Sequence, residues 1–171
     1  ALSGTVIERT VAFVNKRPVL LSDVTLTAAL LDLGQAQSIE HSIDESLMFE
    51  DASRLIKEAA TEEEVGRAVR ELRRKTGPAF TQTALRRKAV WQLTIADYVD
   101  ARLKSLVRVD EATVRRVFNE RLAGADQPPV FSELAPLIRA SLEARALDER
   151  IEEWVASLRV RAQIRRLPAR D

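Results

Sequence analysis

Apolar residues recur every three or four positions along most of the chain, which is the spacing of one face of an α-helix. These apolar stripes predict six helices, over about residues 23–33, 43–59, 62–76, 81–106, 111–122 and 132–158. Within 81–106 the apolar positions cover more of the circumference than a surface helix needs, so this is the predicted central helix.

Alternating apolar and polar residues, the pattern of a half-buried strand, are confined to the two ends of the chain. Two β-favouring runs, residues 11–14 and 19–21, flank the polar turn 15–18 and predict a short hairpin, with Pro18 at an edge or strand start. A second alternation begins at Val160. A lone strand needs partners, so residues 160–167 are expected beside the hairpin near residues 10–21.

Polar residues at fixed offsets predict where helices begin. Ser22 is the expected N-cap of the first helix, and Asp110 caps a later one. The pairs Ser42-x-x-Glu45 and Thr61-x-x-Glu64 have the form of capping boxes. The helix that follows Thr61 is expected to stop at Gly77-Pro78.

The predicted fold class is mainly α, with a small β-sheet formed by the N-terminal hairpin and the C-terminal strand. With 171 residues, 46% of them hydrophobic, the chain is expected to be a single domain, 1–171. The clearest break, residues 123–129, divides it into an N-terminal hairpin with helices (1–124), a linker (125–130) and a C-terminal helix with a strand (131–171).

Composition removes several classes of chemistry. The chain has no cysteine and one histidine, His41, which leaves no thiol nucleophile and little for a metal site or a Ser-His pair. Neither GxGxxG nor GxxxxGK[ST] occurs. Lys and Arg number 27 against 26 Asp and Glu, so nucleic acid is not an expected partner. No apolar run is long enough to cross a bilayer.

Charged side chains along the predicted helices are expected to lie on the faces that contact water. This holds for the acidic group Asp148, Glu149, Glu152 and Glu153, and His41 is expected to be a surface side chain. Basic runs at residues 70–75, 86–88 and 159–166 lack a recognition module beside them. No catalytic or metal-binding residue emerges, and the pattern favours binding over catalysis.

Large apolar side chains are the remaining candidates for function. Leu and Ile stripes on six helices, with a small sheet to cover them, leave apolar surface for a partner chain. The candidates for a peptide- or client-binding groove are aromatic, and each has core packing as the alternative. They are Phe13, Phe49, Trp91, Tyr98 and Trp154.

Residues 11–24 (VAFVNKRPVLLSDV) resemble the "VA.VN...IL.SDV" start of the SurA-type periplasmic chaperones and their parvulin-linked relatives. Residues 61–65 and 107–114 are similar to the "VSDEEV" helix starts of that family. Residues 151–164 resemble its closing "W...LR..A.I" helix and strand. The resemblance covers nearly the whole chain, but residues 125–130 stand where the family usually carries a parvulin prolyl isomerase domain.

The resemblance implies an ATP-independent chaperone without isomerase activity, cofactor or metal. It implies a periplasmic location, with a signal peptide already removed before Ala1-Leu2-Ser3-Gly4, and clients that are unfolded exported or outer-membrane proteins. Two alternatives remain open at this point. One is a structural or assembly module that forms a homodimer by exchange of the C-terminal helix, and the other is a prolyl isomerase without a parvulin fold.

Overall fold

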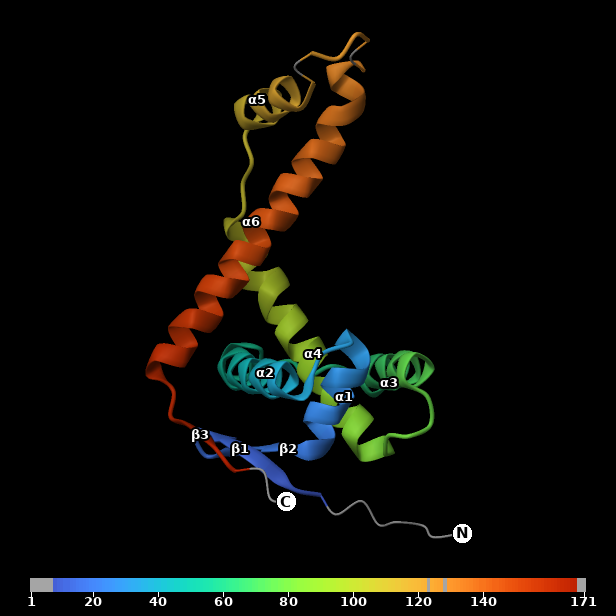
Figure 1. The fold of residues 1–171 in the computed structure, drawn as a ribbon, viewed down its shortest axis with the longest axis vertical. Coiled ribbons are helices and arrows are strands. Elements are labelled where there is room, and N and C mark those ends of the chain that lie inside the picture. Colours follow the sequence, from blue (N-terminus) through green and yellow to red (C-terminus); the bar gives the residue numbers. More distant parts are fainter. Residues whose placement is uncertain (1–7, 123, 128, 169–171) are drawn as a thin grey trace. The chain divides into compact units, whose positions relative to one another are not determined.

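The computed structural model describes residues 8–122, 124–127 and 129–168, and it confirms the predicted fold class. It is mainly helical, with one small antiparallel sheet (Figure 1). In chain order the described elements are β1 (Thr10–Val14), β2 (Arg17–Leu20), α1 (Leu21–Leu31), α2 (Gln35–Leu55), α3 (Glu62–Thr76), α4 (Gln82–Tyr98), α5 (Glu111–Leu122), α6 (Phe131–Arg161) and β3 (Ile164–Arg166). Residues 1–4, and Pro128 of the predicted linker, lie outside the described part of the chain.

The chain forms two compact units. Unit 1 comprises Ala1–Tyr98 together with Val155–Asp171, and unit 2 comprises Val99–Trp154. The chain therefore leaves unit 1 at the end of α4 and returns to it inside α6. This division differs from the segments expected from the polar break at residues 123–129, which falls within unit 2.

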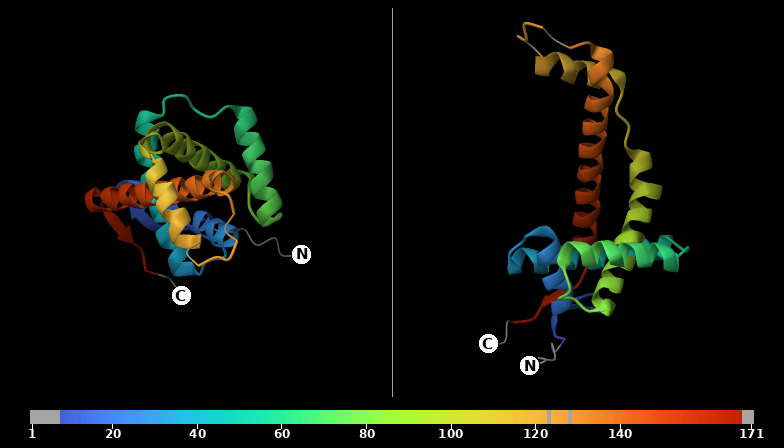
Figure 2. Two further views of the ribbon diagram at one scale, coloured as in Figure 1. Left: turned by 90° about the horizontal axis from the view of Figure 1, so that it is seen from above. Right: turned by 90° about the vertical axis from the view of Figure 1, so that its right-hand side faces the viewer.

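The sheet brings the two ends of the chain together, as predicted. Its order is β2-β1-β3, and both pairs are antiparallel. Asn15 and Lys16 form the hairpin turn, and Asn15 takes a φ of 55°, a left-handed conformation that Asn tolerates well. Pro18 lies in the outer strand β2, where its missing N–H costs no ladder hydrogen bond. The sheet lies on one side of the layer made by α1, α2 and α3 (Figures 1 and 2).

The last strand is shorter than the sequence pattern predicts. Helix α6 continues to Arg161, so Val160 is helical and 87% exposed instead of facing the sheet. The strand β3 that pairs with β1 comprises only residues 164–166. The alternation at 160–162 reflects the solvent side of the last helical turn, because Val160 lies between two exposed or half-exposed arginines there.

The start of α1 also differs from the prediction, because Ser22 is not its N-cap. Leu20 occupies that position, and the Asp23 carboxylate reaches back to accept a hydrogen bond from the Leu20 N–H at 3.2 Å. The Ser22 hydroxyl instead donates to Glu8 at 2.8 Å and accepts from Arg87 at 3.0 Å. The acidic residue one position later satisfies the helix terminus in its place.

The predicted capping box at Ser42 and Glu45 is wrong, because these residues do not lie at a helix start. Helix α2 begins at Gln35, so both residues lie in its interior, and both are buried. The Ser42 hydroxyl donates to the Ser38 carbonyl at 2.7 Å and lies 3.3 Å from the Thr27 hydroxyl of α1. The polar pattern reflects a buried network between helices rather than a helix start.

A buried ion pair lies at the centre of this network. Lys88 of α4 and Glu45 of α2 are 4% and 5% exposed, and their charged atoms are 2.5 Å apart. The Lys88 ammonium also donates to the Thr27 hydroxyl at 3.0 Å. The network therefore joins α1, α2 and α4 through side chains that have little access to water.

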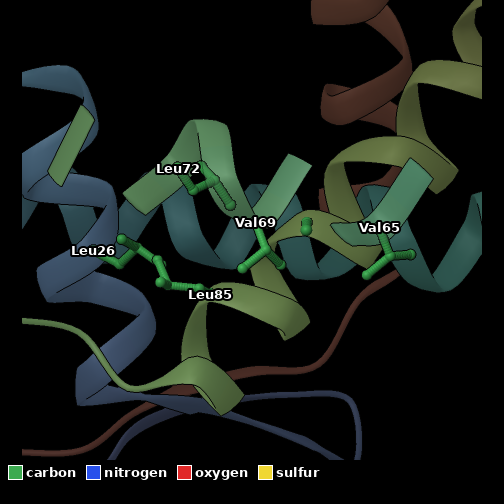
Figure 3. Packing of buried hydrophobic residues seen from close by; sticks show 6 residues of the cluster. Leu26, Val65, Val69, Leu72 and Leu85 are labelled. Atoms are coloured by element: carbon green, nitrogen blue, oxygen red, sulfur yellow. The ribbon is translucent and has the colours of Figure 1, made fainter. Parts of the chain in front are cut away.

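An apolar cluster fills the space between α1, α3 and α4. Leu26, Val65, Val69, Leu72 and Leu85 point toward one another from these three helices (Figure 3). Helix α3 lies beside the first turns of α4 (Figure 2). The predicted boundaries of α3 are confirmed: Thr61 and Glu64 form a reciprocal capping box, and the helix ends before Gly77-Pro78.

The predicted central helix is α-helical over a shorter range than expected. It begins after Thr81, whose hydroxyl accepts from the Ala84 N–H at 3.1 Å, and α4 ends at Tyr98. The chain then continues in unit 2 as a π-helical segment, Val99–Leu103, and a 3₁₀ turn, Lys104–Leu106.

Unit 2 consists of those turns, α5 and the first part of α6. Asp110 caps α5 as predicted, since its carboxylate accepts from the Thr113 N–H at 2.7 Å. Phe118 and Phe131 meet edge to face, with ring centroids 5.2 Å apart, and join α5 to the start of α6. Val114 is fully buried in this unit, whereas Leu137 is 67% exposed.

Four charged residues attach the C-terminal part of the chain to α2 within unit 1. They are named the carboxylate–arginine cluster and consist of Glu40, Asp44, Arg159 and Arg166. Arg166 binds the two Glu40 oxygens at 2.7 and 2.8 Å, and Arg159 bridges Asp44 at 2.5 Å and Glu40 at 3.1 Å. The Arg166 hydrogen bonds, and secondarily those of Arg159, hold the pKa of the Glu40 carboxyl below its usual value.

Removing one partner of the buried ion pair is expected to be much worse than removing both. Lys88→Met leaves the Glu45 carboxylate buried without a counter-charge, which costs about 3–5 kcal/mol of unfolding free energy. The double variant Lys88→Met/Glu45→Met buries no charge and is expected to regain most of that loss. Urea unfolding of the three proteins checks this, and a double variant less stable than the single one contradicts it.

The Glu40 carboxylate is expected to stabilise the fold only above acidic pH. Because its pKa is lowered in the folded protein, its contribution is present above the ordinary value of 4.5 and is lost as the pH falls through the folded pKa. Glu40→Gln is therefore expected to lower the urea midpoint at pH 7 and to match the parent protein at the acid end of a series of pH values. A difference that persists unchanged to the acid end would mean that Glu40 acts through packing rather than charge.

Candidate functional site

Two of the five aromatic candidates meet on unit 1. Phe49 of α2 and Trp91 of α4 stack with ring centroids 5.0 Å apart and an interplanar angle of 12°. Phe49 lies one helical turn beyond Glu45, and Trp91 lies nearly one turn beyond Lys88. The stacked pair therefore continues the contact between α2 and α4 that the buried ion pair begins.

Arg17 of β2 covers this aromatic pair. Its guanidinium carbon lies 5.2 Å from the Phe49 ring centroid and 5.8 Å from the Trp91 ring centroid, which is within the range of a cation–π contact. The Nε atom of Arg17 is buried without a hydrogen-bond partner, and no ion pair involves Arg17 among the residues that the structure describes. Arg17 thus places a positive charge over the stack.

A hollow of about 440 Å³, named the Trp91 hollow, opens along α4 beside the stack. Its apolar lining residues are Trp91, which is only 7% exposed, and the half-buried Val90. The remaining lining residues are polar: Gln82, Thr83, Arg86 and Arg87.

The arginines at the Trp91 hollow are already paired with carboxylates of the same unit. Arg86 lies 2.6 Å from Glu62, and the hydrogen bond between them lowers the Glu62 pKa. Arg87 binds Asp23 at 2.8 Å. The rim therefore offers hydrogen-bonding groups of balanced charge rather than free cations for a phosphate.

A second concavity, named the Leu93 groove, lies between α3 and α4 and has a volume of about 660 Å³. Ala68 and Leu93 are its apolar lining residues. Its rim mixes both signs of charge, from Glu64, Arg67, Arg70, Glu71 and Arg74. No signal in the sequence distinguishes these residues, because both apolar members belong to helical stripes that otherwise enter the core.

The other three aromatic candidates lie elsewhere. Phe13 is half-buried on β1, where Arg165 of β3 lies over its ring at 4.9 Å from the centroid. Phe13 points to the opposite face of the sheet from Arg17, since Arg17 pairs with the next residue, Val14. Tyr98 is half-buried at the end of α4, and Trp154 is buried in unit 2.

The charged groups considered in the sequence mostly lie in ordinary surface ion pairs. In the acidic group, Glu149 pairs with Arg145 at 3.1 Å and Glu153 with Arg150 at 3.3 Å. His41 is exposed, as predicted. In the described part of the chain, no set of three or more His, Cys, Asp or Glu residues is placed to hold a metal ion. None of the described helices combines the length and apolarity that a membrane span requires.

No protein-family model and no curated protein matches the chain.

The stack predicts a specific spectroscopic effect of losing Phe49. In a Trp154→Phe background, Trp91 is the remaining tryptophan. Phe49→Ala is expected to lower the unfolding free energy by about 2 kcal/mol and to shift Trp91 emission to longer wavelength, because water replaces the ring. Phe13→Ala removes a half-buried ring on the other face of the sheet and is the matched control. Equal emission shifts in both variants would show that the stack does not shield Trp91.

Proposed function

We propose that the chain is an ATP-independent periplasmic chaperone that binds unfolded exported or outer-membrane proteins, without prolyl isomerase activity. The observation that carries the proposal is the Trp91 hollow, an open concavity with an aromatic and an aliphatic residue among its lining. A concavity with a partly apolar lining and a few polar groups at its rim is typical of binding sites.

The resemblance to SurA-type chaperones supports the same proposal. The motif that carries it most specifically, residues 11–24, forms β1, β2 and the start of α1. A mainly helical fold whose last strand returns to the N-terminal hairpin agrees with what the resemblance implies. Residues 122–131 connect α5 to α6 directly, so no domain of isomerase size lies between them.

The chemistry of the Trp91 hollow suits weak and reversible binding. An exposed apolar segment of a client loses contact with water against Trp91 and Val90, which provides the favourable free energy. The paired arginines at the rim keep their own carboxylates and add few strong bonds to the client. Release therefore needs no nucleotide, because no single contact is strong.

Aggregation of a denatured outer-membrane protein, followed by light scattering after dilution, tests this function. The intact protein in several-fold excess is expected to delay aggregation, and binding is expected to shift Trp91 emission in the Trp154→Phe background. Absence of any delay over a range of client concentrations would reject the chaperone function.

Two matched variants locate the client on α4. Val90→Gln places an amide in the Trp91 hollow and is expected to weaken the delay of aggregation several-fold, because the apolar lining is lost. Leu93→Gln makes the same chemical change in the Leu93 groove and is expected to leave the delay unchanged. Urea unfolding first establishes that both variants are folded. The opposite order of effects would move the client site to the Leu93 groove.

A further inference from the structure

Trp91 lines an open hollow, yet it is itself only 7% exposed. Two side chains from other elements lie against its ring. Phe49 of α2 stacks on it, and the guanidinium carbon of Arg17 on β2 lies 5.8 Å from the ring centroid. Most of the ring surface that an apolar client segment would contact is therefore covered by other side chains of the same unit.

Phe49 is expected to stay against Trp91, because the helices that carry the two rings are joined nearby. The buried pair of Glu45 and Lys88 links α2 to α4 about one helical turn from the stack. Separating the two helices would break this ion pair where little water can replace it. Exposure of Trp91 through movement of α2 is therefore costly.

Arg17 is held against the rings in a different way. In the described ranges of the chain, no hydrogen bond or ion pair involves its side chain, and its Nε atom is buried without a partner. Arg86 and Arg87 of the Trp91 hollow differ in this respect, because each binds a carboxylate of unit 1. A buried N–H without an acceptor is unfavourable. The position of Arg17 thus combines a favourable contact with two rings and an unsatisfied donor.

The guanidinium can leave the rings by rotation of its own side chain. Arg17 lies next to the hairpin turn, and in the ladder it pairs with Val14 of β1. Its side chain is half-buried, so rotation into water gives the Nε–H a partner and leaves the strand pairing unchanged. Of the two side chains that lie against Trp91, Arg17 is therefore the one that can move without disturbing the core.

We propose that the Arg17 side chain is a displaceable cover of the Phe49–Trp91 pair, which an apolar segment of a client replaces on the rings. This inference rests on the proposed function, because it concerns how the same site becomes accessible. Without a client, the cover keeps apolar ring surface out of water. When a client binds, its apolar side chain takes over the ring contact, and the guanidinium regains water at its buried Nε–H.

Acrylamide quenching of Trp91 fluorescence tests the cover in the absence of a client. In the Trp154→Phe background, Arg17→Ala is expected to raise the quenching constant of Trp91 about twofold, because the indole loses the side chain that lies over it. Acrylamide carries no charge, so the altered charge of the variant does not itself attract or repel the quencher. An unchanged quenching constant would overturn the proposal.

Arg165→Ala in the same background is the matched control. Arg165 also belongs to the sheet and lies over an aromatic ring, that of Phe13, at 4.9 Å from the centroid. Phe13 points to the opposite face of the sheet from Arg17, so this variant is expected to leave the quenching of Trp91 at the parent value. Equal increases in both variants would reflect a general loosening of the sheet and would also overturn the proposal. Urea unfolding establishes that both variants are folded.

Delay of aggregation of a denatured outer-membrane protein tests the displacement. Arg17→Ala is expected to lower about threefold the protein concentration that gives half of the maximal delay, because no guanidinium has to leave the rings. Arg165→Ala is expected to require the parent concentration. A weaker delay with Arg17→Ala would show that Arg17 itself binds the client, which contradicts its role as a cover.

The two measurements separate this inference from the proposed function. A delay of aggregation without a rise in quenching rejects only the cover, and client binding by the chain stands. A rise in quenching without a delay of aggregation by any of the proteins rejects the proposed function, and with it the replacement of Arg17 by a client.

Discussion

The buried pair of Lys88 and Glu45 constrains how the helices of unit 1 can pack. Two charges that have left water are tolerated only at short distance, here 2.5 Å, so α2 and α4 are held in one register. Thr27 adds α1 to the same contact. With this register fixed, Phe49 necessarily meets Trp91 nearly one turn farther along, and the surface beside Trp91 takes its shape. The core of unit 1 and the candidate site therefore share the contact between α2 and α4.

The sequence predicts most elements because helical stripes and caps are local signals. Thr61, Asp110 and the hairpin turn each satisfy backbone groups within a few residues, and the structure confirms them. Ser42 and Glu45 show where local reasoning fails. A serine followed three residues later by a glutamate has the same pattern whether it caps an exposed helix start or joins a buried network. Only the positions of Thr27 and Lys88, which are distant in sequence, decide between them.

The sequence indicates that aromatic residues are candidates for the site, but it indicates only in part which of them lie together. Aromatic residues on heavily apolar helices were a reasonable choice, and two of the five meet in one stack. The crossing of neighbouring helices decides which apolar atoms stay exposed. This crossing cannot be recognised from the pattern of a single sequence. Leu93 and Ala68 follow the same periodicity as core residues yet line an open groove. No pattern in the sequence indicates that Arg17 covers the aromatic pair, because this contact exists only once the fold places β2 against α2 and α4.

In unit 1, apolar burial dominates at the Trp91 hollow, whereas ion pairs contribute most visibly at the carboxylate–arginine cluster. At the Trp91 hollow the arginines are neutralised nearby, so the favourable term for binding is the removal of apolar surface from water, which salt does not screen. At the edge of β1, the three-residue strand β3 is held by backbone hydrogen bonds and by exposed or half-exposed ion pairs around Glu40, and salt and acid both weaken these ion pairs. The helices around Lys88 and Glu45 are therefore expected to stay packed under conditions that loosen β3 and the ion pairs around Glu40.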